Sequence, residues 1–175
     1  MKTSPNRVCF SQSFELFFTS SVSFDGVRVE FRRLLSVNYM TIVTPNEITE
    51  ARSALAGDPN VFTALKVIEE CEGNLEDAFE VLMVESGTEG EGNRLGFGTS
   101  LEQLAQKCRN VICQEDFREE FVDGLSRDLL NALVPVVTAQ LAMMGNLPAA
   151  LAIPVVMYVL KRGIKRFCKS ADSES

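Results

Sequence analysis

Residues 44–86 read TPNEITEARSALAGDPNVFTALKVIEECEGNLEDAFEVLMVES, and this stretch predicts three short helices. Thr44, Pro45 and Glu47 are typical of a helix start. A threonine N-cap and a glutamate three residues later make a capping box, and proline is favoured at the first helical position between them. Gly57 marks the end of this first helix, since glycine commonly follows the last helical turn.

The second and third helices have their own boundary signals. Asp58 and Pro59 repeat the pattern of cap and proline, and Gly73 can take the left-handed conformation that ends a helix before Asn74 caps the next one. Apolar residues recur at spacings of three and four, which predicts one apolar face on each helix and a small shared core. These residues are Ile48, Ala51, Ala54, Leu55, Val61, Leu65, Ile68, Leu75, Ala78, Phe79 and Leu82.

The junction between the second and third helices reads VIEECEGNLEDAFEVL over residues 67–82. It resembles the same junction in ubiquitin-associated (UBA-like) three-helix domains, including the one at the start of elongation factor Ts. The resemblance implies a three-helix fold and a docking module for an apolar patch on another protein. Ubiquitin-binding members carry a Met-Gly-Phe-like loop after the first helix, whereas residues 56–60 here read AGDPN, which argues against ubiquitin as the partner. The longer stretch from Met40 onward resembles small bacterial proteins.

Charge is distributed unevenly along the 175 residues, although the net charge is only −7. Residues 40–98 carry −9, whereas residues 129–175 carry +3. An acidic surface argues against nucleic acid, because nucleic-acid binding neutralises phosphates with Lys and Arg. The charge of the three-helix module favours a protein partner with a basic surface, or a second copy of the chain.

The residues of chemical interest predict no catalytic, cofactor or metal site. The chain has no histidine, and its five cysteines lack the CxxC spacing of a zinc site. We therefore expect buried, reduced cysteines in a cytoplasmic protein that is not an enzyme. Cys108 and Cys113 are the one pair whose spacing would let them meet across a helix end.

Residues 1–39 differ in composition from the rest of the chain, with six of the twelve phenylalanines. Alternating apolar residues around Asp25 and Gly26 favour a β-hairpin. Because Met40 directly precedes the first capped helix, we interpret residues 1–39 as an irregular or disordered extension and Met40 as a candidate natural start. A Ser-rich transit segment is the alternative interpretation.

Residues 87–98 read GTEGEGNRLGFG, which is typical of a flexible linker. The segment lacks the lysine of a phosphate-binding loop. Thr99 and Glu102 form another capping-box pattern, and helical periodicity resumes there and predicts a helical domain over residues 99–170. Acidic residues 115–123 are interpreted as the solvent face of a surface helix.

Residues 129–160 contain no charged side chain. Gly145 and Pro148 divide the segment into two parts that are each shorter than the ~20 residues of a membrane span. Buried core helices, an apolar homo-oligomer interface and a hairpin in one membrane leaflet all fit this pattern, and basic residues directly after it suit both a helix C-terminus and a membrane flank. The residues expected to make the membrane or oligomer contact share one face: Ile153, Val156, Leu160, Ile164 and Phe167.

The sequence thus predicts an all-α protein in which the module at 44–86 is joined to a C-terminal helical domain and packs on the segment 129–160. Its function is predicted to be protein binding without catalysis, and the alternative is a peripheral or hairpin membrane protein. The expected protein-binding residues combine the loop after the first helix with the end of the third helix: Gly57, Asp58, Pro59, Asn60, Phe79, Val81, Leu82 and Met83.

Overall fold

The computed structural model describes residues 41–87, 99–114, 125–145 and 147–169, and the predicted all-α fold is confirmed over these residues. They contain helices and a single isolated β-bridge, with no strand. The predicted hairpin, residues 88–98 of the predicted linker and the acidic residues 115–123 lie outside the described residues. The helices are α1 (Pro45–Ala54), α2 (Pro59–Glu70), α3 (Leu75–Glu85), α4 (Leu101–Lys107), α5 (Arg109–Ile112), α6 (Arg127–Gly145), the 3-10 turn η3 (Ala149–Leu151), α7 (Ala152–Arg162) and α8 (Ile164–Lys169).

The predicted caps of α1, α2 and α3 are all present. The Thr44 hydroxyl accepts from the Glu47 backbone N–H, and the Glu47 carboxylate accepts from the Thr44 backbone N–H at 2.7 Å. The side chains of Asp58 and Asn74 accept from backbone N–H groups in the first turns of α2 and α3. Local sequence chemistry therefore sets where each of these helices begins.

The turn between α2 and α3 supports the chain that leads into α1. Gly73 has φ +83°, and its carbonyl accepts from the Val43 N–H at 2.9 Å. A Cβ built on Gly73 would lie 2.1 Å from the Val43 carbonyl oxygen, so a side chain there would displace this contact. The β-bridge between Ile42 and Asn74 belongs to the same contact.

Helix α4 begins one residue later than the sequence suggested. Ser100, and not Thr99, is the N-cap, and its partner in the capping box is Gln103 in place of Glu102. Both pairs have the required spacing, so the sequence pattern alone does not separate them.

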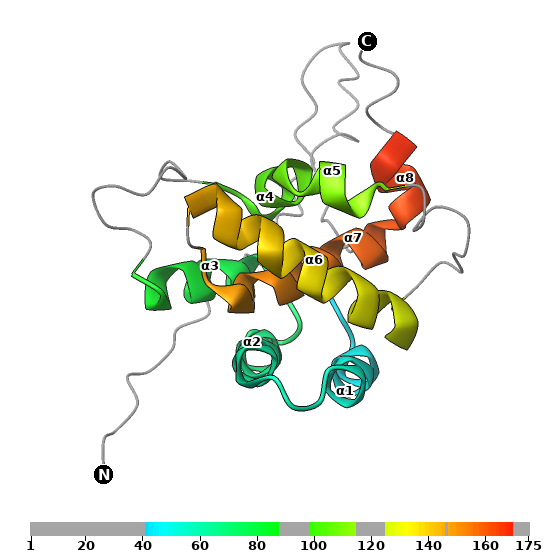
Figure 1. Cartoon of the computed structure of the whole chain (residues 1–175). Coiled ribbons are helices and arrows are strands. Elements are labelled where there is room, and N and C mark those ends of the chain that lie inside the picture. Colours follow the sequence, from blue (N-terminus) through cyan, green and yellow to red (C-terminus); the bar gives the residue numbers. More distant parts are fainter. Residues whose placement is uncertain (1–40, 88–98, 115–124, 146, 170–175) are drawn as a thin grey trace, which may run out of the picture.

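The uncharged segment forms two helices separated at the predicted position. Helix α6 ends at Gly145, and α7 follows the turn η3. Every residue of α7 from Ala152 to Leu160 is buried. In Figure 1, α6 crosses the front of the molecule and α7 runs behind it, with α1 and α2 on one side and α4, α5 and α8 on the other.

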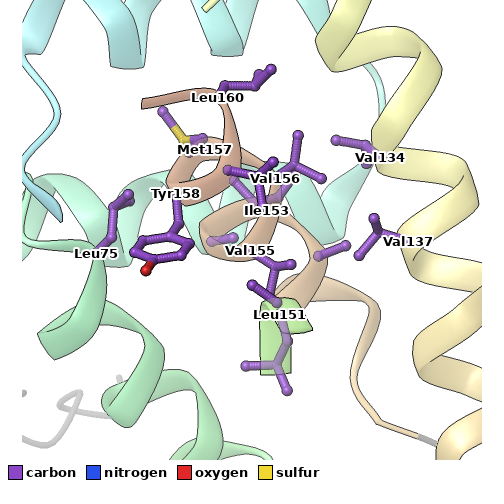
Figure 2. Packing of buried hydrophobic residues seen from close by; sticks show 14 of the residues in the cluster. Leu75, Val134, Val137, Leu151, Ile153, Val155, Val156, Met157, Tyr158 and Leu160 are labelled. Carbon is purple, nitrogen blue, oxygen red and sulfur yellow. The ribbon is translucent and has the colours of Figure 1, made fainter. Parts of the chain in front are cut away.

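Helix α7 is the centre of a single hydrophobic core. It contacts α2, α3, α4, α6 and α8, while α1 contacts α6. Figure 2 shows Leu75 of α3 facing Tyr158 of α7, and Val134 and Val137 of α6 approaching the opposite side of the same helix. The buried residues of the two predicted parts belong to one cluster, so the expectation that residues 44–86 pack on the uncharged segment is confirmed.

Candidate functional site

The loop between α1 and α2 lies on the surface, where the sequence analysis placed it. Gly57, Asp58, Pro59 and Asn60 are all exposed. One turn after Pro59, the side chain of Phe62 is 60% exposed on the outer face of α2. This phenylalanine was not among the expected binding residues. The sequence did contain a signal for its exposure, because Phe62 lies outside the three- and four-residue spacing of the core residues of α2.

Two of the expected binding residues in α3 are not on the surface. Phe79 is only 1% exposed and Leu82 only 4%, so the prediction that they lie at the exposed end of the helix is wrong. The physical reason is their spacing, which puts them on the core face of α3 with the buried residues Leu75 and Ala78. Val81 and Met83 are half-buried against the edge of the core.

The outer face of α3 carries a different set of four residues. Asp77, Glu80, Val81 and Val84 have the same i, i+3, i+4, i+7 spacing as the core residues but follow the other side of the helix, and we call them the outer stripe. Glu80 and Val84 are exposed, whereas Asp77 and Val81 are half-buried. The side chain of Val84 is 56% exposed. The outer stripe therefore presents two valines beside two carboxylates. The three- and four-residue spacing that predicted the core face of α3 would also have predicted the outer stripe from the sequence.

The carboxylates of α3 repel one another. Desolvation raises the pKa of Glu76, and the negative charges of Glu80, Asp77 and Glu102 raise it further. Desolvation also raises the pKa of Asp77, whose carboxylate accepts from the Asn74 side chain at 2.9 Å. A cation placed beside these groups would favour their ionised forms.

The described residues divide into an acidic part and a basic part. Residues 41–87 hold ten acidic and two basic side chains, or −8, whereas the other described residues hold two acidic and eight basic ones, or +6. The two parts meet where Lys161 at the end of α7 pairs with Glu47 at 3.0 Å. The chain therefore supplies a basic neighbour to the start of α1. The outer stripe lies on the side of α3 opposite its core face.

The five residues expected to contact a membrane or a second copy are inside the protein. Ile153, Val156, Leu160, Ile164 and Phe167 are buried, so the prediction that they form a contact surface is wrong. Three of them lie on α7 and two on α8, which begins after Gly163, so the expected single face is divided between two helices. Neighbouring helices of the same chain cover α7.

The exposed part of the uncharged segment lies on α6. Among the described residues, α6 is the one helix long and apolar enough to cross a membrane, and one third of its apolar window is buried. Its outward residues include Pro135, Ala139, Ala142 and Met143, and the side chain of Met143 is 75% exposed. Length and composition of this kind also occur in core helices of soluble proteins, so they do not identify a membrane span.

The cysteines depart from the expectation of reduced side chains. Cys113 forms a disulfide with Cys168, and not the contact with Cys108 that the spacing suggested. Cys108 is free and buried, as expected, and burial raises the pKa of its thiol to about 11. Within the described ranges, no group of three His, Cys, Asp or Glu side chains is arranged to hold a metal ion.

No protein-family model matches the chain, and no curated protein or solved structure is similar enough to it to count as a match. The case for a function therefore rests on the surface of the molecule itself. The outer stripe of α3 is the site where the exposed side chain of Val84 lies on the same face as the carboxylates of Asp77 and Glu80.

Proposed function

We propose that the chain is a non-catalytic protein-binding module whose first three helices are UBA-like, and that it binds a basic amphipathic segment of a partner protein on the outer stripe of α3. The observation that carries this proposal is the position of Val84. Its side chain is 56% exposed on the face that also holds Asp77 and Glu80. An apolar partner residue over Val81 and Val84 would remove apolar surface from water, and partner lysines or arginines would reach the two carboxylates.

The electrostatics of α3 support a cationic partner. The pKa values of Glu76 and Asp77 are raised, first by desolvation and, for Glu76, also by the neighbouring carboxylates. A positive group would relieve this repulsion, since an opposite charge nearby stabilises an ionised carboxylate. The net charge of −8 over residues 41–87 would also speed the approach of such a partner at low salt.

The size of the outer stripe sets the expected strength of binding. Helix α3 has eleven residues and is therefore about 16 Å long. A single helix face of that length gives a small interface, which is typical of transient complexes. The exposed loop residues Gly57–Asn60 and Phe62 are proposed as a second contact for a longer partner.

The test is a nuclear magnetic resonance titration of the isotope-labelled full chain with a synthetic amphipathic helix made of lysine and leucine. The expected result is that amide shifts concentrate on Asp77, Glu80, Val81 and Val84. A matched peptide with glutamate in place of lysine should leave these signals unmoved. Shifts spread evenly over the acidic surface, or confined to other helices, would contradict the proposal.

Two charge-reversal variants distinguish an effect of the outer stripe on binding from an effect of the overall net charge. Glu80→Lys changes the outer stripe, whereas Glu50→Lys makes the same change of charge on the exposed surface of α1. We expect Glu80→Lys to weaken binding of the lysine–leucine peptide by at least about tenfold and Glu50→Lys by less than about threefold. Equal losses would mean that the peptide responds only to overall charge.

The alternative proposal is a peripheral membrane protein. It rests on the outward face of α6, because α7 is covered and cannot supply the contact. The same face of α6 is where a homo-oligomer would form. Vesicle flotation and gel filtration of wild type and Met143→Asp decide between these uses of α6: loss of flotation supports the membrane, and loss of a dimer supports the oligomer.

A further inference from the structure

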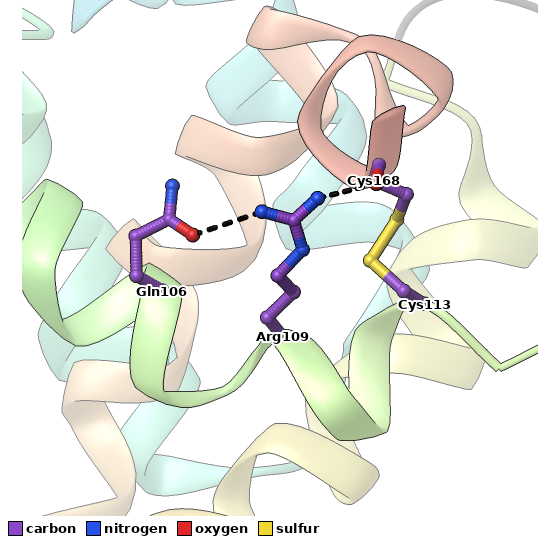
Figure 3. Close-up of a disulfide and its surroundings, with 4 residues drawn as sticks. All are labelled: Gln106, Arg109, Cys113 and Cys168. Carbon is purple, nitrogen blue, oxygen red and sulfur yellow. Dashed lines mark hydrogen bonds between the residues drawn. A yellow bond between two sulfur atoms is a disulfide. The ribbon is translucent and has the colours of Figure 1, made fainter. Parts of the chain in front are cut away.

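A disulfide joins the last turn of the short helix α5 to the C-terminal helix α8. The two residues, Cys113 and Cys168, are 55 positions apart in the sequence, and their Cα atoms are 5.7 Å apart. Figure 3 shows the bridge beside Arg109, whose guanidinium reaches towards α8 and the Gln106 side chain. The bridge is therefore a covalent clasp between α8 and a distant part of the chain.

Other contacts from the described part of the chain also hold α8. Ile164 and Phe167 are buried, and Arg109 lies over the Phe167 ring with 5.6 Å between the guanidinium carbon and the ring centroid. Arg109 also donates to the backbone carbonyl of Cys168. Helix α8 has only six residues and is separated from α7 by Gly163, which has φ +82°. A helix this short is not stable by itself, so its order depends on these contacts and on the clasp.

We propose that the Cys113–Cys168 bridge is a site of thiol–disulfide exchange, and that a dithiol reductant opens it and frees α8. The reductant's thiolate attacks the Cys113 sulfur, which belongs to a half-buried residue, and the electron pair of the broken S–S bond leaves on the buried Cys168 sulfur. The second thiol of the reductant then closes the reductant's own disulfide and releases Cys113. Two electrons and two protons pass from the dithiol to the two cysteines.

The surroundings favour this order of events. Arg109 of α5 donates a hydrogen bond to the backbone of Cys168. The exposed Lys165, Arg166 and Lys169 belong to α8, the helix that holds Cys168. Positive charge near a sulfur stabilises the departing thiolate. Cys108 does not compete for the bridge, because it is fully buried and its raised pKa keeps it as a thiol.

Release of α8 would change the surface at this end of the molecule. The buried side chains of Ile164 and Phe167 would lose their contacts with the core, and the three cations of α8 would move away from α5. The clasp therefore makes the exposure of α8, a basic and partly apolar segment, depend on whether a dithiol reductant is present. This inference does not depend on the binding of a partner at α3.

The experiment is limited trypsin digestion of the full chain, oxidised and then treated or not treated with dithiothreitol, with the products identified by mass. Cleavage after Lys165 and Arg166 should become at least roughly tenfold faster after reduction, because local opening controls proteolysis in a folded chain. An unchanged rate overturns the proposal. So does a non-reducing peptide map of the oxidised protein that lacks the Cys113–Cys168 link.

The matched control is the double variant Cys113→Ser, Cys168→Ser. It should be cut rapidly after Lys165 and Arg166 whether or not dithiothreitol is present. Cys71 is also disulfide-bonded, so a reductant effect that persists in the double variant would assign the response to another bridge and overturn the proposal. If the double variant does not fold, Cys71→Ser, which lacks the other bridge, takes its place: reduction should still make cleavage after Lys165 and Arg166 at least roughly tenfold faster, and an unchanged rate overturns the proposal.

Discussion

Helices α3 and α7 have eleven residues each and contribute to the same core, but they use their surfaces differently. Helix α7 is buried on every side from Ala152 to Leu160, so it has no face left for a partner. Helix α3 buries one stripe and leaves Glu80 and Val84 of the outer stripe exposed, with Val81 half-buried beside them. The difference shows that the apolar residues free for binding lie in the more charged of the two helices.

The largest expected effect is on the free energy of unfolding, when the same change from valine to aspartate is made separately in each helix. Val156→Asp in α7 puts a carboxylate where the side chain is fully buried, and it should lower the free energy of unfolding by more than about 4 kcal/mol. Val84→Asp in the outer stripe should change it by less than about 0.5 kcal/mol. Urea unfolding followed by circular dichroism measures both. Similar losses for the two variants would mean that α3 has no free outer face.

The next largest effect concerns the turn that leads into α3. Gly73→Ala adds a Cβ that meets the Val43 carbonyl oxygen and strains a residue with φ +83°, so we expect a loss of roughly 2–3 kcal/mol. Gly57→Ala is the control. That residue has φ +110° but no atom within 4 Å of the added Cβ, and its cost should be about 1 kcal/mol. Equal costs in urea unfolding would show that the contact with Val43 does not stabilise the turn.

The contact between the acidic and basic parts should make stability depend on pH. Burial alone would raise the pKa of Glu47, but hydrogen bonds from the Thr44 backbone, Lys161 and the Thr44 side chain outweigh it, and the net pKa lies below the ordinary 4.5. A lowered pKa stabilises the fold above about pH 4.5 and loses that contribution as the pH falls through the folded value. Wild type should therefore lose roughly 0.5–1 kcal/mol more than Glu47→Gln on acidification. Parallel pH profiles of the thermal midpoint would contradict this account of the pair with Lys161.

The smallest effect is on the pH dependence of binding. The pKa of Glu76 is raised above its ordinary 4.5, and that of Asp77 above 3.8, so part of the negative charge on α3 is lost earlier on acidification than ordinary carboxyl groups predict. Affinity for the lysine–leucine peptide should therefore fall on acidification, and the fall should begin at a higher pH than the ordinary values of 4.5 and 3.8 imply. Fluorescence anisotropy at constant salt measures the change, and Glu76→Gln should flatten it. A pH-independent affinity would show that the charges of Glu76 and Asp77 do not contribute to binding at the outer stripe.

Much of the fold followed from local signals in the sequence. Capping at Thr44, Asp58 and Asn74 predicted the starts of three helices because a cap depends on residues within one turn. The break after Gly145 was equally readable, since glycine and proline interrupt helices wherever they occur.

Other features could not be predicted because they depend on how helices far apart in the sequence meet. Periodicity placed Phe79 and Leu82 with the core residues of α3, and the packing of residues 44–86 on the uncharged segment was expected, but neither signal said that α7 would be the helix of that segment that meets α3. The bridge from Cys113 to Cys168 requires two residues that are distant in the sequence to come within the reach of a disulfide. The packing of α5 on α6, of α6 on α7 and of α7 on α8 brings them together.

The most direct test of the proposed function measures stability and affinity on one variant, Val84→Asp. We predict that its free energy of unfolding stays within about 0.5 kcal/mol of wild type while its affinity for the lysine–leucine peptide falls at least about tenfold. A variant that is equally stable and binds the peptide as tightly as wild type would contradict the claim that the outer stripe of α3 is the binding site.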